Sequence, residues 1–188
     1  MAGELVDQMR PGDFFREASM GYDPVGFSAL TPVPATSGQM RGVSFQKMNP
    51  GSASGTPPVN YEYYNILSTI PANLTVGTGL TFFLTVTDDG LDPNDLGKVA
   101  KFGIAVKKLT SGVTCDLSAS AGTEGTNTVT LASTTGQTAQ FSLAIVNANL
   151  NGAGAGDQIG IRIRRVGTDA ADTCNGRVIC VGGHVKNT

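Results

Sequence analysis

Alternating apolar and polar positions run through most of the chain after residue 40 and predict β-strands. In QIGIRIRRV, Ile159, Ile161 and Ile163 share one side of an extended chain, and the other side is occupied by Gly160, Arg162 and Arg164. Such a strand has one face in a core and the other in water. Alternation or enrichment in β-branched residues marks eight segments: 41–48, 59–70, 79–88, 99–109, 126–133, 138–147, 157–166 and 177–187.

Turn-forming sequences such as NPGSASGTPP, DDGLDPNDLG and NGAGAG separate these segments. Gly, Pro, Asn, Asp and Ser favour turns because their side chains or backbone suit tight chain reversal. Eight short strands with this spacing predict an all-β fold, an eight-stranded jelly-roll sandwich of two packed sheets. A smaller immunoglobulin-like sandwich is the alternative, although the Cys–Trp–Cys core signature is absent.

Residues 1–40 differ from the rest of the chain. ELVDQMR predicts a short helix before Pro11, DFFREAS predicts a second short turn, and TPVPATSG predicts an extended segment. We therefore divide the chain into an extended N-terminal anchoring arm, 1–40, and a jelly-roll domain, 41–188. The arm is too short for a core of its own, so we expect four aromatic side chains to pack onto another surface: Phe14, Phe15, Tyr22 and Phe27.

Composition narrows the possible functions. Of the 188 residues 15% are charged and 40% hydrophobic, and the net charge is −2, which is typical of neither a disordered nor a membrane protein. Lysines and arginines are scattered, so we expect no nucleic-acid partner. The first residues lack the apolar segment of a secretory signal, and we expect none.

The cysteines and the single histidine offer little chemistry. The odd count of Cys115, Cys174 and Cys180 without a secretory signal predicts reduced thiols in a cytoplasmic setting, acting as small apolar residues. Whether Cys174 and Cys180 pair across a hairpin stays open. His184 has no second histidine with which to build a common metal site, so we interpret it as a strand residue.

Two acidic segments are candidate sites. In GTDAADTCN, Asp169 and Asp172 are predicted to be structural turn residues, because Asp and Thr side chains cap the backbone of tight connections. Asp88, Asp92 and Asp95 belong to the acidic loop DDGLDPNDLG, where calcium binding is the alternative to a solvated loop. The loop lacks EF-hand spacing and a closing bidentate Glu. We therefore predict no metal site.

The sequence contains no clear set of catalytic residues. No serine lies in a GxSxG elbow, and a carboxylate pair for glycoside hydrolysis, from the acidic loop and Glu62, cannot be inferred from sequence alone. The sequence also shows few candidates for an exposed aromatic platform of the kind that a sugar cleft needs. We expect no catalytic residues, no cofactor and no enzyme activity.

The last third, AGAGDQIGIRIRRVGTDAADTCNGRVICVGGHV, resembles a recurring ending of bacteriophage virion jelly-roll proteins, and LTFFLTVTDD and KFGIAVKKL resemble their inner strands. The resemblance covers roughly residues 60–188. It is to capsid decoration (cement) proteins and to head-fibre and tail-fibre modules, which are typically trimeric.

This resemblance implies a capsid decoration protein that trimerises on the outer shell of a virion and stabilises it. Its partners would be other copies of the same chain and the major capsid protein. It would be assembled in the host cytoplasm and located on the capsid surface. The four aromatic side chains of residues 1–40 would contact the shell. A head-fibre or tail-fibre attachment module is one alternative. A carbohydrate-binding or hydrolytic β-sandwich is an alternative of another class.

Overall fold

The computed structural model describes residues 5–9, 15–18, 21–24, 30–33, 40–45, 63–73, 77–90, 93–111 and 122–188. Within the first 65 residues, side chains are described for Gln8 and Phe45 alone. Among the described residues, no helix has both the length and the apolar character needed to cross a bilayer.

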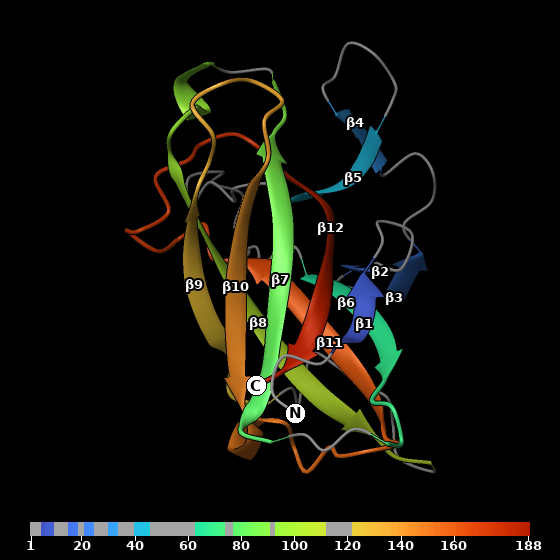
Figure 1. Ribbon diagram of the computed structural model, residues 1–188. Helices are drawn as coiled ribbons and strands as arrows, with labels where there is room; N and C mark the ends of the chain where they lie inside the picture. Colours follow the sequence, from blue (N-terminus) through green and yellow to red (C-terminus); the bar gives the residue numbers. More distant parts are fainter. Residues whose placement is uncertain are drawn as a thin grey trace, which may run out of the picture.

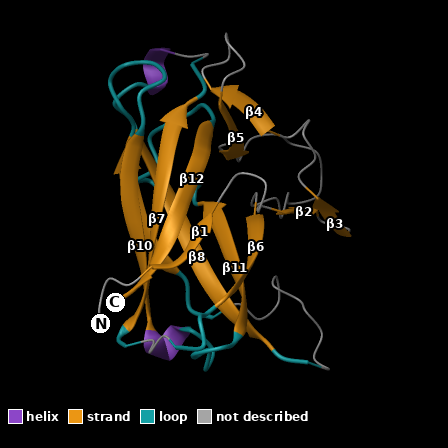
Figure 2. Ribbon diagram, turned by 45° about the vertical axis from the view of Figure 1, so that its right-hand side comes forward, coloured by secondary structure: helices purple, strands orange, loops and turns teal. Residues whose placement is uncertain are grey.

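The eight segments predicted from the alternation are all strands. Their bounds are β5 (Met40–Phe45), β6 (Tyr63–Thr69), β7 (Gly79–Asp88), β8 (Val99–Leu109), β9 (Gly125–Thr130), β10 (Ala139–Val146), β11 (Gln158–Arg165) and β12 (Val178–Asn187). The 3-10 turns η3 (Pro93–Asp95) and η4 (Asn147–Asn149) lie at opposite ends of the molecule (Figure 2).

These eight strands form the jelly roll that the sequence predicts. One sheet, sheet A, contains the order β10-β7-β12-β5, and the other, sheet B, contains the order β6-β11-β8-β9, with antiparallel pairs throughout. The last strand therefore lies between the first and the third, as Greek-key connections require. Figure 1 shows β10, β7 and β12 side by side in one layer, with β8 and β11 behind them.

Four further strands precede β5. They are β1 (Leu5–Met9), β2 (Phe15–Ala18), β3 (Gly21–Pro24) and β4 (Leu30–Val33). Strand β1 pairs with β12, β2 pairs with β3 and β6, and β4 pairs with β5. The predicted helix at ELVDQMR and the turn at DFFREAS are therefore wrong. A helix of seven residues is marginal alone, whereas neighbouring strand edges satisfy the same backbone groups.

The space between the two sheets is filled by apolar side chains. Phe45, Phe82 and Phe102 are fully buried, and the Phe102 ring centroid lies 5.2 Å from those of Phe45 and Phe141. Alternate residues of β7 (Leu80, Phe82, Leu84, Val86) face this core. The intervening side chains of β7 consequently face outward from sheet A.

One edge of the sandwich is closed. Strand β9 ends sheet B and β10 ends sheet A, and the Asn127 side chain donates to the Ser142 carbonyl across the gap, 2.8 Å away. At Gly125, a Cβ atom would lie 2.3 Å from the Ala144 carbonyl oxygen. Only glycine allows so close an approach, so the two sheets are joined along this edge.

Candidate functional site

The first acidic segment, between β11 and β12, is tied to the neighbouring strand β8. The Asp169 carboxylate accepts hydrogen bonds from the Ala171 backbone N–H, 2.9 Å away, and from the Lys101 ammonium, 2.6 Å away. The hydrogen bond from Lys101 is the main reason why the pKa of Asp169 is lowered. Both side chains are partly exposed, so this ion pair holds a surface connection in place.

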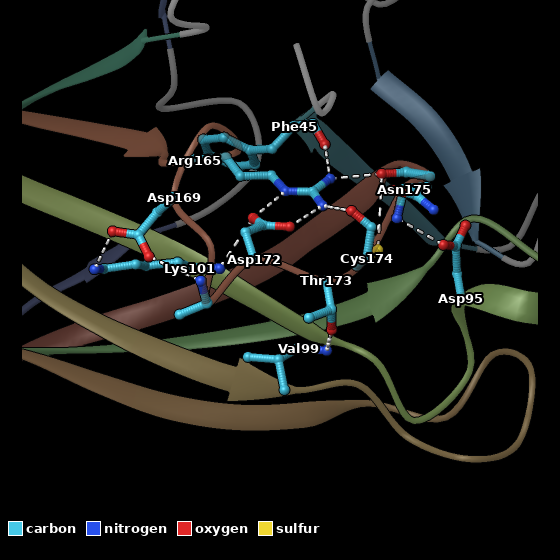
Figure 3. A network of polar contacts seen from close by, with 12 residues as sticks. Phe45, Asp95, Val99, Lys101, Arg165, Asp169, Asp172, Thr173, Cys174 and Asn175 are labelled. Carbon is cyan, nitrogen blue, oxygen red and sulfur yellow. Dashed lines mark hydrogen bonds and ion pairs between the residues drawn. The ribbon is translucent and has the colours of Figure 1, made fainter. Parts of the chain in front are cut away.

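Asp172, in contrast, is buried with Arg165. Arg165 Nε and Nη2 donate to the two oxygens of Asp172 at 2.8 and 2.7 Å, and both side chains are fully enclosed (Figure 3). One of these oxygens also accepts the Lys101 backbone N–H. Burial lowers the pKa of Arg165, but the Asp172 hydrogen bond and charge outweigh this effect, so that its pKa is raised overall.

The remaining N–H groups of Arg165 donate hydrogen bonds to the backbone carbonyls of three residues. Nη1 donates to Gly176 and Phe45, and Nη2 donates to Cys174. Every N–H of the guanidinium thus has an acceptor, which is what makes a buried arginine tolerable. With no unused donor and no exposure, this group joins β11, β5 and the β11–β12 connection rather than offering a ligand site.

The two described cysteines are free and buried. Burial raises the pKa of the Cys174 thiol to about 11 and that of Cys180 to about 12. Protonated thiols are poor nucleophiles. These residues act as small apolar side chains, as expected, while Cys115 lies outside the described residues.

The second acidic segment is used for backbone contacts. Asp88 is buried and accepts hydrogen bonds from the Gly90 and Gly136 N–H groups. Asp95 is also buried, and its Oδ1 accepts the Asn175 N–H at 2.9 Å. Asp92 lies outside the described residues, and within those that are described no group of three acidic, histidine or cysteine side chains could hold a metal ion.

Four aromatic residues are the predicted anchors of the arm. The side chains of Phe14, Phe15, Tyr22 and Phe27 lie outside the described residues, and so does Glu62. The division at residue 40, the anchoring role and the homotrimer stay predictions, as do the major capsid protein partner and the virion location.

The outer face of sheet A carries an arrangement that the sequence did not reveal. Phe83 on β7 is directly opposite His184 on β12 and Ser142 on β10. The rings of Phe83 and His184 stack with centroids 4.8 Å apart and planes at 12°. We call the outward residues of these three strands the aromatic platform: Thr81, Phe83, Thr85, Gln140, Ser142, Gly182, His184 and Lys186.

Polar groups surround the stacked rings. The Lys186 ammonium lies 5.5 Å from the Phe83 ring centroid, and Thr81 beside it shares a 2.7 Å hydroxyl hydrogen bond with Thr188. On the other side, Gln140 donates weakly to Thr85 over 3.4 Å. Opposite Thr85 lies Gly182, which has no side chain.

Several of these groups are available to a ligand. Within the described part of the chain, neither the His184 ring nitrogens nor the Ser142 hydroxyl has a hydrogen-bond partner. Phe83, His184 and Lys186 are each partly exposed. Figure 1 shows the layer of β10, β7 and β12 with no described strand in front of it. The platform is therefore an accessible surface with aromatic, hydroxyl, amide and ammonium groups together.

The sequence-based account missed this surface for a clear reason. We interpreted His184 as a strand residue and noted few candidates for an exposed aromatic platform. A histidine and a phenylalanine far apart in the sequence become a stacked pair only through the register of β7 with β12. The available signal was alternation alone, which places Phe83 and His184 on outward positions without making them neighbours.

Comparison with known proteins identifies no family. No protein-family description and no curated sequence matches the chain. Similar solved structures include a mutant Xylanase10C from Cellvibrio japonicus in complex with xylopentaose, with TM-score 0.41 and 12% identity over 100% of this chain and 28% of that one. The CBM27-1 structure from Caldicellulosiruptor saccharolyticus, in complex with mannohexaose, gives TM-score 0.32 and 11% identity over 78% of this chain and 72% of that one.

A glycoside hydrolase family 43 arabinoxylan arabinofuranohydrolase from Bacillus subtilis, in complex with cellotetraose, gives TM-score 0.34 and 13% identity over 79% of this chain. The chain spans only 25% of that protein's length. Such weak likeness extends to the β-sandwich fold alone, so it assigns neither ligand nor activity to this chain.

The predicted function as a capsid decoration protein is wrong. The similar solved structures include glycoside hydrolases, a carbohydrate-bound module and a cyclase from Fischerella sp., and none of these is a virion protein. The jelly roll, which the resemblance to virion proteins also implies, is a fold that proteins of many functions share. The function has to be argued from the chain's own surface.

Proposed function

We propose that this chain binds carbohydrate on the aromatic platform of sheet A and does not cleave it. The observation that carries the proposal is the stacked pair of Phe83 and His184, 4.8 Å apart, in the middle of an outward sheet face. An aromatic pair on a surface exposes apolar area that water solvates poorly, and a ligand that covers it gains free energy.

A saccharide suits this surface better than other ligands. Its ring has an apolar C–H face that packs on aromatic rings, and its hydroxyl groups both donate and accept hydrogen bonds. The platform provides partners of the same dual kind in Ser142, Thr85 and Gln140. Nucleic acid would need a larger basic surface than a chain of net charge −2 supplies.

The contacts of the described carboxylates support the non-catalytic part of the proposal. Glycoside hydrolysis needs two carboxyl groups on either side of the scissile bond. Among the described residues, Asp157, Asp169, Asp172 and Glu124 are each paired with a lysine or arginine. Asp88 and Asp95 hold backbone N–H groups. None of these lies on the platform strands' outward positions.

The test is binding of the full chain to a glycan array that carries neutral and acidic saccharides, followed by titration calorimetry with the best ligand. Phe83→Ala should weaken binding at least tenfold, because truncating an aromatic side chain at the centre of an interface costs about 2 kcal/mol or more. Leu67→Ala is the matched control, since Leu67 is a large apolar residue on sheet B with 57% exposure.

The control should bind normally. Melting curves of both variants would show that each is folded. If no saccharide binds, or if Phe83→Ala and Leu67→Ala bind equally well, the platform is not a carbohydrate site. Release of reducing sugar during incubation would contradict the non-catalytic part of the proposal.

A further inference from the structure

The aromatic platform has a positive charge that no described acidic group neutralises. Lys186 extends along the sheet face until its ammonium is 5.5 Å from the Phe83 ring centroid. It forms no ion pair with any described residue. The cation–π contact with Phe83 contributes only about 0.5–1 kcal/mol at an exposed site, and an ammonium has three donors.

Two comparable lysines on sheet B, in contrast, form ion pairs. Lys101 and Lys108 are paired with Asp169 and Asp157 at 2.6 and 2.7 Å. On sheet A the described neighbours of Lys186 are neutral: Thr81 stands opposite it on β7, and Ala144 follows on β10. Gln8, the one β1 side chain that is described, stands opposite His184 and is also neutral.

Donor groups collect around the same place. The hydroxyls of Thr81 and Thr188 lie 2.7 Å apart beside Lys186, and the His184 ring nitrogens have no hydrogen-bond partner within the described residues. An ammonium with neighbouring hydroxyl and imidazole groups is suited to an anion, because hydrogen bonds between charged partners are the stronger ones.

We infer that the saccharide bound on the platform is anionic and that Lys186 pairs with its carboxylate or sulfate group. This inference rests on the proposed function and adds the class of sugar to it. A sugar that stacks on the Phe83–His184 pair would bring a charged ring substituent within reach of the ammonium. A uronic acid and a sulfated sugar share this chemistry.

The test is affinity electrophoresis, which measures how strongly the full chain is retarded in gels that contain polygalacturonate, dextran sulfate or neutral dextran. Wild type is compared with Lys186→Gln and with Lys98→Gln. Lys98 is an exposed lysine at the start of sheet B's β8 region, so its replacement changes the net charge equally while leaving the platform intact.

Binding to one of the two anionic polymers should exceed binding to dextran at least tenfold and should weaken as salt increases. Lys186→Gln should lower the affinity for the anionic polymer at least fivefold, and Lys98→Gln should change this affinity little. Retardation by polygalacturonate identifies a uronate ligand, and retardation by dextran sulfate alone identifies a sulfate ligand.

Two outcomes separate the claims. Equal binding to dextran and to the anionic polymers, or equal effects of the two lysine variants, would overturn the anionic ligand while leaving carbohydrate binding in place. Failure of all three polymers and of the glycan array would remove the proposed function itself.

Discussion

Replacing either member of the buried pair Arg165–Asp172 should destabilise the chain more than breaking any of its surface ion pairs. Asp172→Asn leaves a guanidinium enclosed without a counter-charge, and breaking a buried pair on one side costs about 3–5 kcal/mol. For a domain of this size the melting temperature should fall by roughly 6–20 °C.

The contacts of Arg165 predict a difference between the two single variants. Arg165→Met removes the partner of Asp172 and also the donors to the carbonyls of Phe45, Cys174 and Gly176. Each buried carbonyl left without a donor costs about 1–3 kcal/mol. Arg165→Met should therefore be the more harmful change. The double variant, Arg165→Met with Asp172→Asn, should be close to Arg165→Met alone, because the two residues form one unit.

Urea denaturation gives the free energies of unfolding for all of these variants. Lys108→Met serves as the control, since the ion pair of Lys108 with Asp157 is exposed by 34% and 27% at its two side chains and should be worth at most about 1 kcal/mol. If Asp172→Asn costs no more than Lys108→Met, the enclosed pair does not hold the β11–β12 connection and the reasoning fails.

Two further predictions concern acid stability and the closed edge of the sandwich. Hydrogen bonds from Lys108 and Lys101 lower the pKa of Asp157 and Asp169, so their contribution is present above the unfolded pKa near 3.9 and is lost as pH falls through the lower folded value. Asp157→Asn with Asp169→Asn should make melting temperature less dependent on pH below about pH 4; an unchanged acid slope would contradict this. Gly125→Ala should lower the free energy of unfolding by about 1–3 kcal/mol, because its Cβ would clash with the Ala144 carbonyl. Urea denaturation measures this change, and an unaltered free energy of unfolding would show that the clash is relieved.

The strands of the jelly roll could be predicted because their signal is local. Each of the eight has its own alternation or enrichment in β-branched residues, and the alternation is visible in the burial of most residues of β7 and β11. The first 40 residues have weak local patterns, and strands such as β1 exist because β12 offers an edge to pair with. That pairing joins residues from opposite ends of the sequence, which no local pattern reports.

The sites depended on the same long-range register. Asp169 and Asp172 look alike in GTDAADTCN, yet one faces solvent beside Lys101 and the other is enclosed by Arg165. Alternation places position 165 on the inner face with Ile161 and Ile163, whereas the charge of an arginine predicts exposure. Only the pairing of Arg165 with Asp172 shows why the charged side chain can be buried there. Likewise, His184 becomes a candidate ligand-binding residue only because its ring stacks on that of Phe83.

The central place of β12 in sheet A determines when the chain can fold. Of the twelve described strands this is the last to be synthesised, yet it lies between β7 and β5 and also pairs with β1. Until residues 178–187 leave the ribosome, one edge of β7 has no partner and sheet A is divided between β7 and β5. Open edges of this kind invite wrong pairing. Sheet A therefore cannot be completed before β12 is available, and slower folding follows from such distant contacts.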